Sequence, residues 1–468
     1  MPDKTFPFSG SPNQRQTGVN DRRFINGIFD ASQNSIARTQ EVYFTFRPCL
    51  GTHLQPGGAS TGRGVHYWAA TSTLYSVFGN VIFAGGSTTL AMNTSSGRCW
   101  FEETPANTGD QVLIISDGQD NFTFNLSNVG TVIDENTDAN YPTNNLGPVV
   151  YLDTYLVQAQ ADGDIWNTRL NSVSSWAASN LTRAAWRGDE LRFLHRIGDQ
   201  LRFFGANSIE SFYHQGTPIG SPFLRIQQNA KDFGIAAKET AAWSGETLVF
   251  VRESQAQGDG RQVYLMTEGS GKDISNSVIN RFLDIEGQSI SSATAWMERV
   301  GGQLLYCLNL AAANRSWVYN IDNGTWSEWT ATSSTQQFTG AYSTSHKGTV
   351  YIQGASDGLV SILSVSTFQD NGSAVPWTIQ TERISYGTNR IKTEEELSLI
   401  ADTAAVTVST SWSDDDGKSF TYPVEIDCSV IDKRITRLGS FRERLYRFSA
   451  TPATSFRAQG HRHRITVV

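Results

Sequence analysis

The ten residues Leu74-Tyr-Ser-Val-Phe-Gly-Asn-Val-Ile-Phe83 have the pattern of two short β-strands joined by a tight turn. Gly79 and Asn80 tolerate the positive φ angles of such a turn, and β-branched and aromatic residues flank them. Similar units recur as far as Leu363, at intervals close to the roughly 40 to 50 residues of a propeller blade. The repeat therefore predicts a β-propeller.

One marker residue from each unit measures the spacing of the repeat. The markers are Tyr75, Leu113, Tyr155, Leu201, Leu248, Leu305 and Val350. The steps between them are 38, 42, 46, 47, 57 and 45 residues, and most of these match a blade. The 57-residue step contains a predicted short helix at residues 275–283, and the first or last unit could belong to a flanking segment. We therefore predict an all-β chain whose propeller has six blades, with five to seven left open.

The sequence on either side of the repeat predicts two further segments. Residues 1–62 are rich in Pro, Gly, Ser, Asn and Gln and contain one clear strand at 41–47. This N-terminal arm could close the propeller at residues 63–375 or reach a neighbouring subunit. From residue 376 to 468 longer strands replace the hairpins, which predicts a C-terminal β-sandwich. A second, weaker helix is expected at residues 182–195.

The composition limits the class of protein. With 39% hydrophobic residues, the chain of 468 residues can bury a large core. Its four cysteines are scattered without a CxxC pair, so neither a zinc site nor a disulfide framework is expected. We expect the four cysteines to be free, buried thiols. The sequence also lacks an apolar run of the roughly 18 residues that a membrane span needs. We expect no metal or cofactor.

Positive charge is concentrated at the end of the chain. The segment from Lys433 to Val468 contains nine basic residues and a single acidic one, Glu443, although the whole chain carries a net charge of -8. Such a segment can face DNA or an acidic protein, or form only a soluble strand edge. The candidate DNA- or partner-facing residues are Arg442, Arg444, Arg447, Arg457, Arg462 and Arg464. His461 and His463 lie among them, and the arginines beside them favour a solvated or anion-facing strand over a metal site.

Catalytic motifs are missing from the sequence. It contains no P-loop, GxSxG or HExxH, so hydrolytic chemistry has no starting residue and we predict no enzyme. The stretch Ser413-Asp-Asp-Asp-Gly-Lys-Ser-Phe420 fits the Asp-box pattern of sialidases and other β-proteins. A single copy favours a structural hairpin turn, in which Asp415 accepts backbone N–H groups, Gly417 supplies an unusual φ and Phe420 anchors the loop, with Ser413 opening it.

Several stretches in the same order and spacing carry a family resemblance. They are residues 63–67, 74–80, 203–212, 233–236, 263–271, 293–298 and 317–320, together with Trp326. On these stretches the chain resembles the tail accessory factor, or packaged DNA stabilisation protein, of short-tailed bacteriophages. That family forms the nozzle or hub of the tail.

The resemblance implies a structural virion protein without catalytic activity. It implies a homo-hexameric ring below the portal-adaptor that extends the DNA channel, helps to retain packaged DNA and anchors tail fibres or tailspikes. A tail needle or plug and the genomic DNA are the other implied partners. The implied location is the phage tail, after synthesis in the host cytoplasm. The alternatives are a glycan-binding or glycan-degrading propeller related to sialidases, and a cytoplasmic propeller scaffold.

Overall fold

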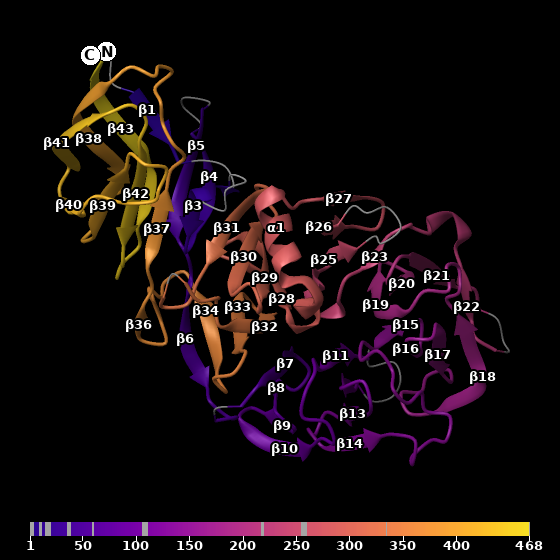
Figure 1. Cartoon of the computed structure of the whole chain (residues 1–468). Helices are drawn as coiled ribbons and strands as arrows, with labels where there is room; N and C mark the ends of the chain where they lie inside the picture. The colour runs from indigo at the N-terminus through magenta and orange to yellow at the C-terminus, as the bar shows by residue number, and fades with distance from the viewer. Residues whose placement is uncertain are drawn as a thin grey trace.

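A computed structural model describes residues 4–8, 12–14, 20–34, 39–58, 60–104, 111–216, 220–253, 260–333 and 335–467. These residues form two lobes, a large β-propeller and a smaller β-sandwich in which both chain ends lie (Figure 1). The predicted all-β propeller with an added sandwich is confirmed. In the described ranges, no helix has the length and apolar character that a membrane span requires.

Seven blades surround one channel in the described part of the chain, and each blade is a small antiparallel sheet (Figure 1). Blade 1 contains β7 (Gly62–Trp68), β8 (Thr73–Phe78), β9 (Val81–Ala84) and β10 (Ser87–Ala91). Blade 2 contains β11 (Trp100–Glu103), β12 (Leu113–Ser116), β13 (Asn121–Phe124) and β14 (Gly130–Ile133). Blade 3 contains β15 (Val150–Leu152), β16 (Tyr155–Ala159), β17 (Asp164–Thr168) and β18 (Trp176–Arg183).

The remaining blades follow in chain order. Blade 4 contains β19 (Leu191–Ile197), β20 (Gln200–Gly205), β21 (Ile209–His214) and β22 (Phe223–Arg225). Blade 5 contains β23 (Gly234–Ile235), β24 (Ala242–Ser244), β25 (Thr247–Glu253), β26 (Arg261–Met266) and β27 (Gly271–Asp273). Blade 6 contains β28 (Thr294–Val300), β29 (Gln303–Leu310), β30 (Arg315–Asn320) and β31 (Thr325–Trp329). Blade 7 contains β32 (Gly340–His346), β33 (Thr349–Gly354) and β34 (Val360–Ser364).

The blade number is seven rather than the favoured six, within the range that the repeat left open. Each marker residue lies on one hydrogen-bonded inner strand of its own blade: β8, β12, β16, β20, β25, β29 and β33. The long step is explained by α1 (Ser277–Glu286), which begins after its N-cap Asn276 and is inserted between blades 5 and 6. The weaker helix expected at residues 182–195 was wrong, because β18 and β19 occupy its two ends.

The N-terminal segment closes the propeller. β6 (Cys49–Leu54) pairs antiparallel with β34 and becomes the fourth strand of blade 7, with Leu50 opposite Leu363. The next strand along the chain, β7, opens blade 1 beside β32. Two distant parts of the sequence therefore share one blade, and the ring is held shut by backbone hydrogen bonds.

The sandwich also takes strands from both ends of the chain. One sheet contains β1 (Lys4–Pro7), β4 (Gly27–Asn34), β5 (Thr39–Phe46), β43 (Arg457–Val467), β38 (Lys392–Ala401) and β41 (Arg434–Phe441). The other contains β2 (Asn13–Gln14), β3 (Asn20–Ile25), β37 (Trp377–Gln380), β42 (Leu445–Ala450), β39 (Thr407–Ser413) and β40 (Val424–Asp427). The segment at residues 1–62 thus differs from the predicted arm with one strand, because β1, β3 and β6 form there by pairing with strands far away in the sequence.

A continuous sheet joins the two lobes. Ile25 of β3 pairs in parallel with Glu328 of β31, so the sheet of blade 6 runs on into a sheet of the sandwich. Arg23 reinforces this joint with hydrogen bonds of 2.8–3.2 Å to the Glu328 carboxylate, which is buried. A short hairpin, β35 (Gln369–Asp370) with β36 (Ser373–Ala374), lies between blade 7 and β37 along the chain.

Arg47 occupies the point where the arm, blade 6 and the β35 hairpin meet. Its guanidinium is 1% exposed and forms an ion pair with Asp370 of β35. It also donates to the Asn26 side chain at 2.9 Å and to the Thr330 carbonyl at 3.0 Å. The same cation lies 5.3 Å from the centre of the Trp329 ring. We call this set of contacts the Arg47 junction.

The first prediction concerns this junction. Arg47→Met is expected to lower the free energy of unfolding by about 3–5 kcal/mol, because it leaves the Asp370 carboxylate buried without its cation. Arg187→Met is the matched control, since Arg187 pairs with Asp232 at the surface and such pairs contribute below about 1 kcal/mol. Chemical unfolding followed by tryptophan fluorescence measures both. Equal losses in the two variants would contradict the prediction.

Candidate functional site

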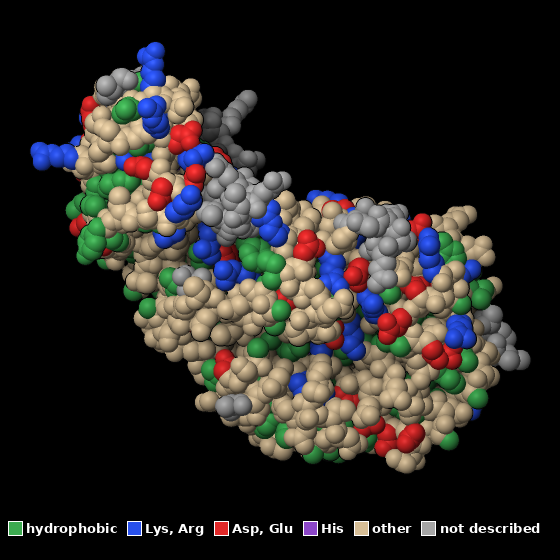
Figure 2. Space-filling view, viewed as in Figure 1, with side chains coloured by type: hydrophobic (Ala, Val, Ile, Leu, Met, Phe, Trp, Pro, Cys, Tyr) green, Lys and Arg blue, Asp and Glu red, His purple; other side chains and the backbone are tan. Residues whose placement is uncertain are grey.

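Strand β43 places its basic residues on one face and its histidines on the other. Arg462 and Arg464 are exposed, whereas His461 and His463 are 2% and 0% exposed, as the two-residue period of a strand requires. Arg434, at the start of β41 in the same sheet, pairs with Glu396 at 3.1 Å. Arg464 lies 3.7 Å from the same carboxylate. We call Arg434, Arg462 and Arg464 the outer basic face. Figure 2 shows Lys and Arg side chains projecting from this lobe.

The other four candidate arginines make contacts within the sandwich. Arg442 is exposed and donates to the Asn389 carbonyl at 2.7 Å. Arg447 lies 3.6 Å from the centre of the Phe420 ring and donates to Gln380. Arg457 forms an ion pair of 2.7 Å with Asp402, and Arg444 is buried. The structure therefore does not gather the six candidates into one surface, and the expectation that Arg444 faces a partner was wrong.

Arg444 belongs instead to a buried polar cluster around Glu394. The Glu394 carboxylate accepts from Arg444 at 3.0 Å and from the Tyr446 hydroxyl at 2.7 Å. Its other oxygen lies 2.6 Å from Nδ1 of His463, and His463 contacts His461 through its second ring nitrogen. We call these five residues the Glu394 network. A buried carboxylate needs such partners, because desolvation is costly for an unpaired charge.

The two histidines are core residues, which corrects the expected solvated strand. Burial, followed by the neighbouring His463, lowers the pKa of His461 well below its ordinary value. The His461 ring stacks on Phe6 of β1 at 5.6 Å, so the N-terminal strand covers it. Within the described residues, no group of three or more His, Cys, Asp or Glu side chains could hold a metal ion.

The Asp-box stretch forms the turn between β39 and β40. Asp415 accepts from the Ser419 N–H at 2.9 Å and from the Ser413 hydroxyl at 2.7 Å. Hydrogen bonds from Ser419 and Ser413 lower the pKa of Asp415 to about 2. Gly417 has a φ of 79°, and Phe420 is half-buried beneath Arg447. These contacts are those of a structural turn.

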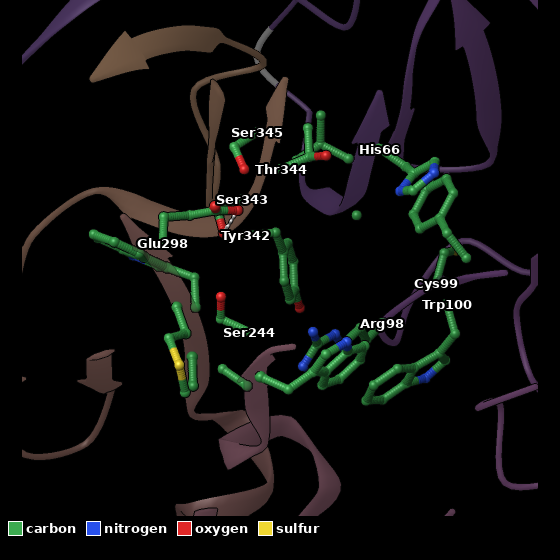
Figure 3. A pocket seen from close by; sticks show the side chains of 18 of the residues that line it. His66, Arg98, Cys99, Trp100, Ser244, Glu298, Tyr342, Ser343, Thr344 and Ser345 are labelled. Carbon is green, nitrogen blue, oxygen red and sulfur yellow. Dashed lines mark hydrogen bonds between the residues drawn. The ribbon is translucent and has the colours of Figure 1, made fainter. Parts of the chain in front are cut away.

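A cavity of about 410 Å³ lies in the propeller channel (Figure 3). Strands β7, β11, β24, β28 and β32 line it, so five blades contribute to its wall. Tyr342 points into its centre, with Arg98 beside the tyrosine and Glu298 on the opposite side (Figure 3). We call it the channel cavity. It could not be predicted from the sequence, because its residues come from separate blades and match no motif.

Several ionisable side chains of the channel have shifted pKa values. Burial raises the pKa of Glu102 to about 7, although a hydrogen bond from the Tyr151 N–H opposes the shift. Burial also raises the pKa of Glu298, which accepts from Ser343 at 2.9 Å. In the adjoining part of the channel, burial lowers the pKa of His195 to about 3.

A pH dependence of stability follows from the buried His461. The unfolded chain binds a proton at this side chain below about pH 6.5, whereas the folded chain does not, so stability should fall as the pH drops through that value. His461→Phe is expected to reduce this slope, which for one proton is at most about 1.4 kcal/mol per pH unit. His53→Phe, at an exposed position, is the control. Unfolding free energies measured between about pH 7.5 and about pH 5 test this, and equal slopes in both variants would contradict it.

Comparison with known proteins identifies the family. No curated protein matches the chain. The extracellular domain of a putative one component system from B. thetaiotaomicron is similar in structure, with 12% identity and a TM-score of 0.43 over 76% of this chain and 44% of that one. The chain thus spans less than half of that domain. Virginiamycin B lyase from Staphylococcus aureus is similar with 11% identity and a TM-score of 0.44, over 68% of this chain and 99% of that one. Likenesses this distant carry no inference about activity.

The match that identifies the chain is to a protein family. The family described as Bacteriophage P22 Gp10, beta-propeller, matches residues 25–357. The matched segment runs from the last residue of β3 to the loop before β34, so it includes the Arg47 junction except Asp370 and nearly the whole propeller. It agrees with the resemblance found in the sequence. The chain therefore belongs to this family of bacteriophage tail accessory and DNA-stabilisation proteins.

Proposed function

We propose that the chain is a tail nozzle or hub subunit of a short-tailed bacteriophage. Six copies would form a ring below the portal-adaptor, extend the DNA channel, help to retain packaged DNA and anchor tail fibres or tailspikes. The family match over residues 25–357 is the observation that carries this proposal. A tail needle or plug would close the channel below. The chain would have no catalytic role and no cofactor.

The way in which the lobes are joined supports a role as a wall segment. The propeller is closed by β6, and the sandwich continues the sheet of blade 6. The buried Arg47 junction connects the arm, blade 6 and the β35 hairpin. A subunit that resists the outward push of packaged DNA must transmit force without its lobes separating, and these joints favour that property. A ring also needs unlike surfaces that meet side by side and close after a fixed number of copies.

The outer basic face supports a contact with DNA. The outer basic face presents the three guanidinium groups of Arg434, Arg462 and Arg464, together with the carboxylates of Glu396 and Asp432, which pair with Arg434 at 3.1 and 2.8 Å. Contacts of this kind are made to phosphates and are sensitive to salt, because bound counterions are released. We assign this face to the DNA of the tail channel.

The ring proposal is tested by the mass of the assembled protein. The purified chain, mixed with its portal-adaptor ring, is expected to give a species with six copies of the chain in mass photometry. Contacts between neighbours above about 1,000 Å² would make that ring stable. The chain alone is the control, and it is expected to be monomeric or hexameric. A chain that never joins the adaptor, and that is missing from purified virions, would refute the proposal.

The DNA contact makes a separate prediction. The double variant Arg462→Ala/Arg464→Ala is expected to bind duplex DNA more weakly and to reduce the salt dependence of log K by up to about 2. Arg183→Ala/Arg187→Ala, at exposed positions on the propeller, is the matched control. Fluorescence anisotropy across a salt series measures both. An unchanged slope in the first variant would show that the outer basic face does not contact DNA.

A further inference from the structure

The channel cavity has the size and lining of a small-molecule site. Its volume of about 410 Å³ lies in the range of roughly 300–1,000 Å³ that is common for ligand pockets. Aromatic rings and a few polar groups converge in it, including Tyr342, Ser343 and Glu298 (Figure 3). Trp243 also lines it. The five contributing blades fix these groups on strands, and strands hold side chains more precisely than loops do.

Arg98 brings a positive charge to the cavity without a carboxylate to pair with it. Its guanidinium lies 4.1 Å from the centre of the Trp100 ring and 5.2 Å from that of Tyr342. One of its nitrogens donates to the Ala241 carbonyl at 3.1 Å. In the described part of the chain, no carboxylate lies within ion-pair distance of it, whereas Arg47 and Arg444 each have one.

The surroundings of Arg98 also favour the binding of an anion. Burial lowers the pKa of this guanidinium, and Tyr342 and Glu239 oppose the shift only in part. A guanidinium has five N–H donors arranged to bind both oxygens of a carboxylate. With one donor used by the Ala241 carbonyl, the cation retains capacity for a bound anion.

The opposite wall is suited to hydroxyl groups. Glu298 accepts from the Ser343 hydroxyl at 2.9 Å, and burial raises the pKa of its carboxyl group, so this group is less often charged than a solvated one. Ser244 and Ser345 add two further hydroxyls to the lining (Figure 3). Such groups both donate and accept, as the hydroxyls of a polyol do. The half-buried Trp243 ring, which stacks on Trp100, adds an apolar side chain to the lining.

The other carboxylates of the lining repel an anion less than their number suggests. One oxygen of Glu103 lies 2.7 Å from Nε2 of His66 and is occupied by this contact. Glu102 accepts from the Tyr151 N–H, and its pKa of about 7 leaves it partly neutral near neutral pH. Among the residues that line the cavity, Arg98 is the single lysine or arginine.

We infer that the channel cavity binds an acidic monosaccharide unit, such as a uronic acid, with its carboxylate on Arg98. The sugar hydroxyls lie against Ser343, Ser345 and Glu298, and the ring rests on Trp243. The site binds this group without a covalent step. It is independent of the ring assembly and of the outer basic face.

Titration of the full-length protein with D-glucuronate and with D-glucose tests the site. The two sugars differ in the carboxylate, so glucuronate is expected to bind about tenfold more tightly or better, as one charge-assisted bidentate contact allows. Arg98→Met should abolish this preference. Arg98→Lys, which keeps the charge but loses the planar fork, should retain only part of it. Calorimetry or saturation-transfer NMR measures the affinities.

Arg299→Met is the matched control, because Arg299 lies next to Glu298 on β28 but pairs with Asp322 at the surface, outside the lining. Its preference for glucuronate should equal that of the unmodified chain. Thermal unfolding establishes that each variant is folded, and Arg98→Lys serves as the cavity variant if Arg98→Met is not folded. The inference is overturned if neither sugar binds, if glucuronate binds no better than glucose, or if the folded cavity variants retain the full preference.

Discussion

The buried ion pair between Arg47 and Asp370 is the contact on which the arrangement of the two lobes depends. A guanidinium can bind several acceptors at once, and here it takes one from each segment that meets at the junction: Asn26 of the arm, Thr330 after blade 6 and Asp370 before the sandwich. Leu50, the second residue of the closing strand β6, donates its N–H to the same Asp370 carboxylate at 2.9 Å. Closure of the propeller and attachment of the sandwich therefore use one charged group, and a side chain with fewer donors could not serve all of these partners.

The N-terminal segment makes the two lobes interdependent. It supplies β1 to β5 to the sandwich and β6 to blade 7, while the sandwich receives its other strands from the end of the chain. Neither lobe is built from one continuous stretch of sequence, so neither keeps all its strands if the arm is removed. The two buried charge clusters, at Arg47 and at Glu394, lie where distant strands meet. Buried charges tolerate few alternative partners, because an unpaired one is costly, and both clusters thus help to specify which strands pair.

Local patterns in the sequence predicted the propeller and much of the sandwich. Hairpins repeat their turn residues and their apolar strands at a regular interval, and Tyr75, Leu113 and the other markers each fall on a separate blade. The Asp-box turn is likewise local, because Ser413, Asp415 and Ser419 bond to one another. The arm was underestimated because β1, β3 and β6 depend on pairing with residues hundreds of positions away. The Glu394 network and the channel cavity were missed for the same reason, since their members carry no shared motif.

The sequence was sufficient to predict the fold class, the hairpin repeat and the family, because these depend on neighbours along the chain. It also placed Arg462 and Arg464 on a strand with His461 and His463. Which face of that strand is covered depends on the packing of distant segments, since the covering residues come from β1 and β42. The same holds for Arg98, whose charge matters because five blades bring Tyr342, Glu298 and Trp243 around it. Burial and partners depend on contacts between distant segments, and these contacts fix what each charged side chain can do.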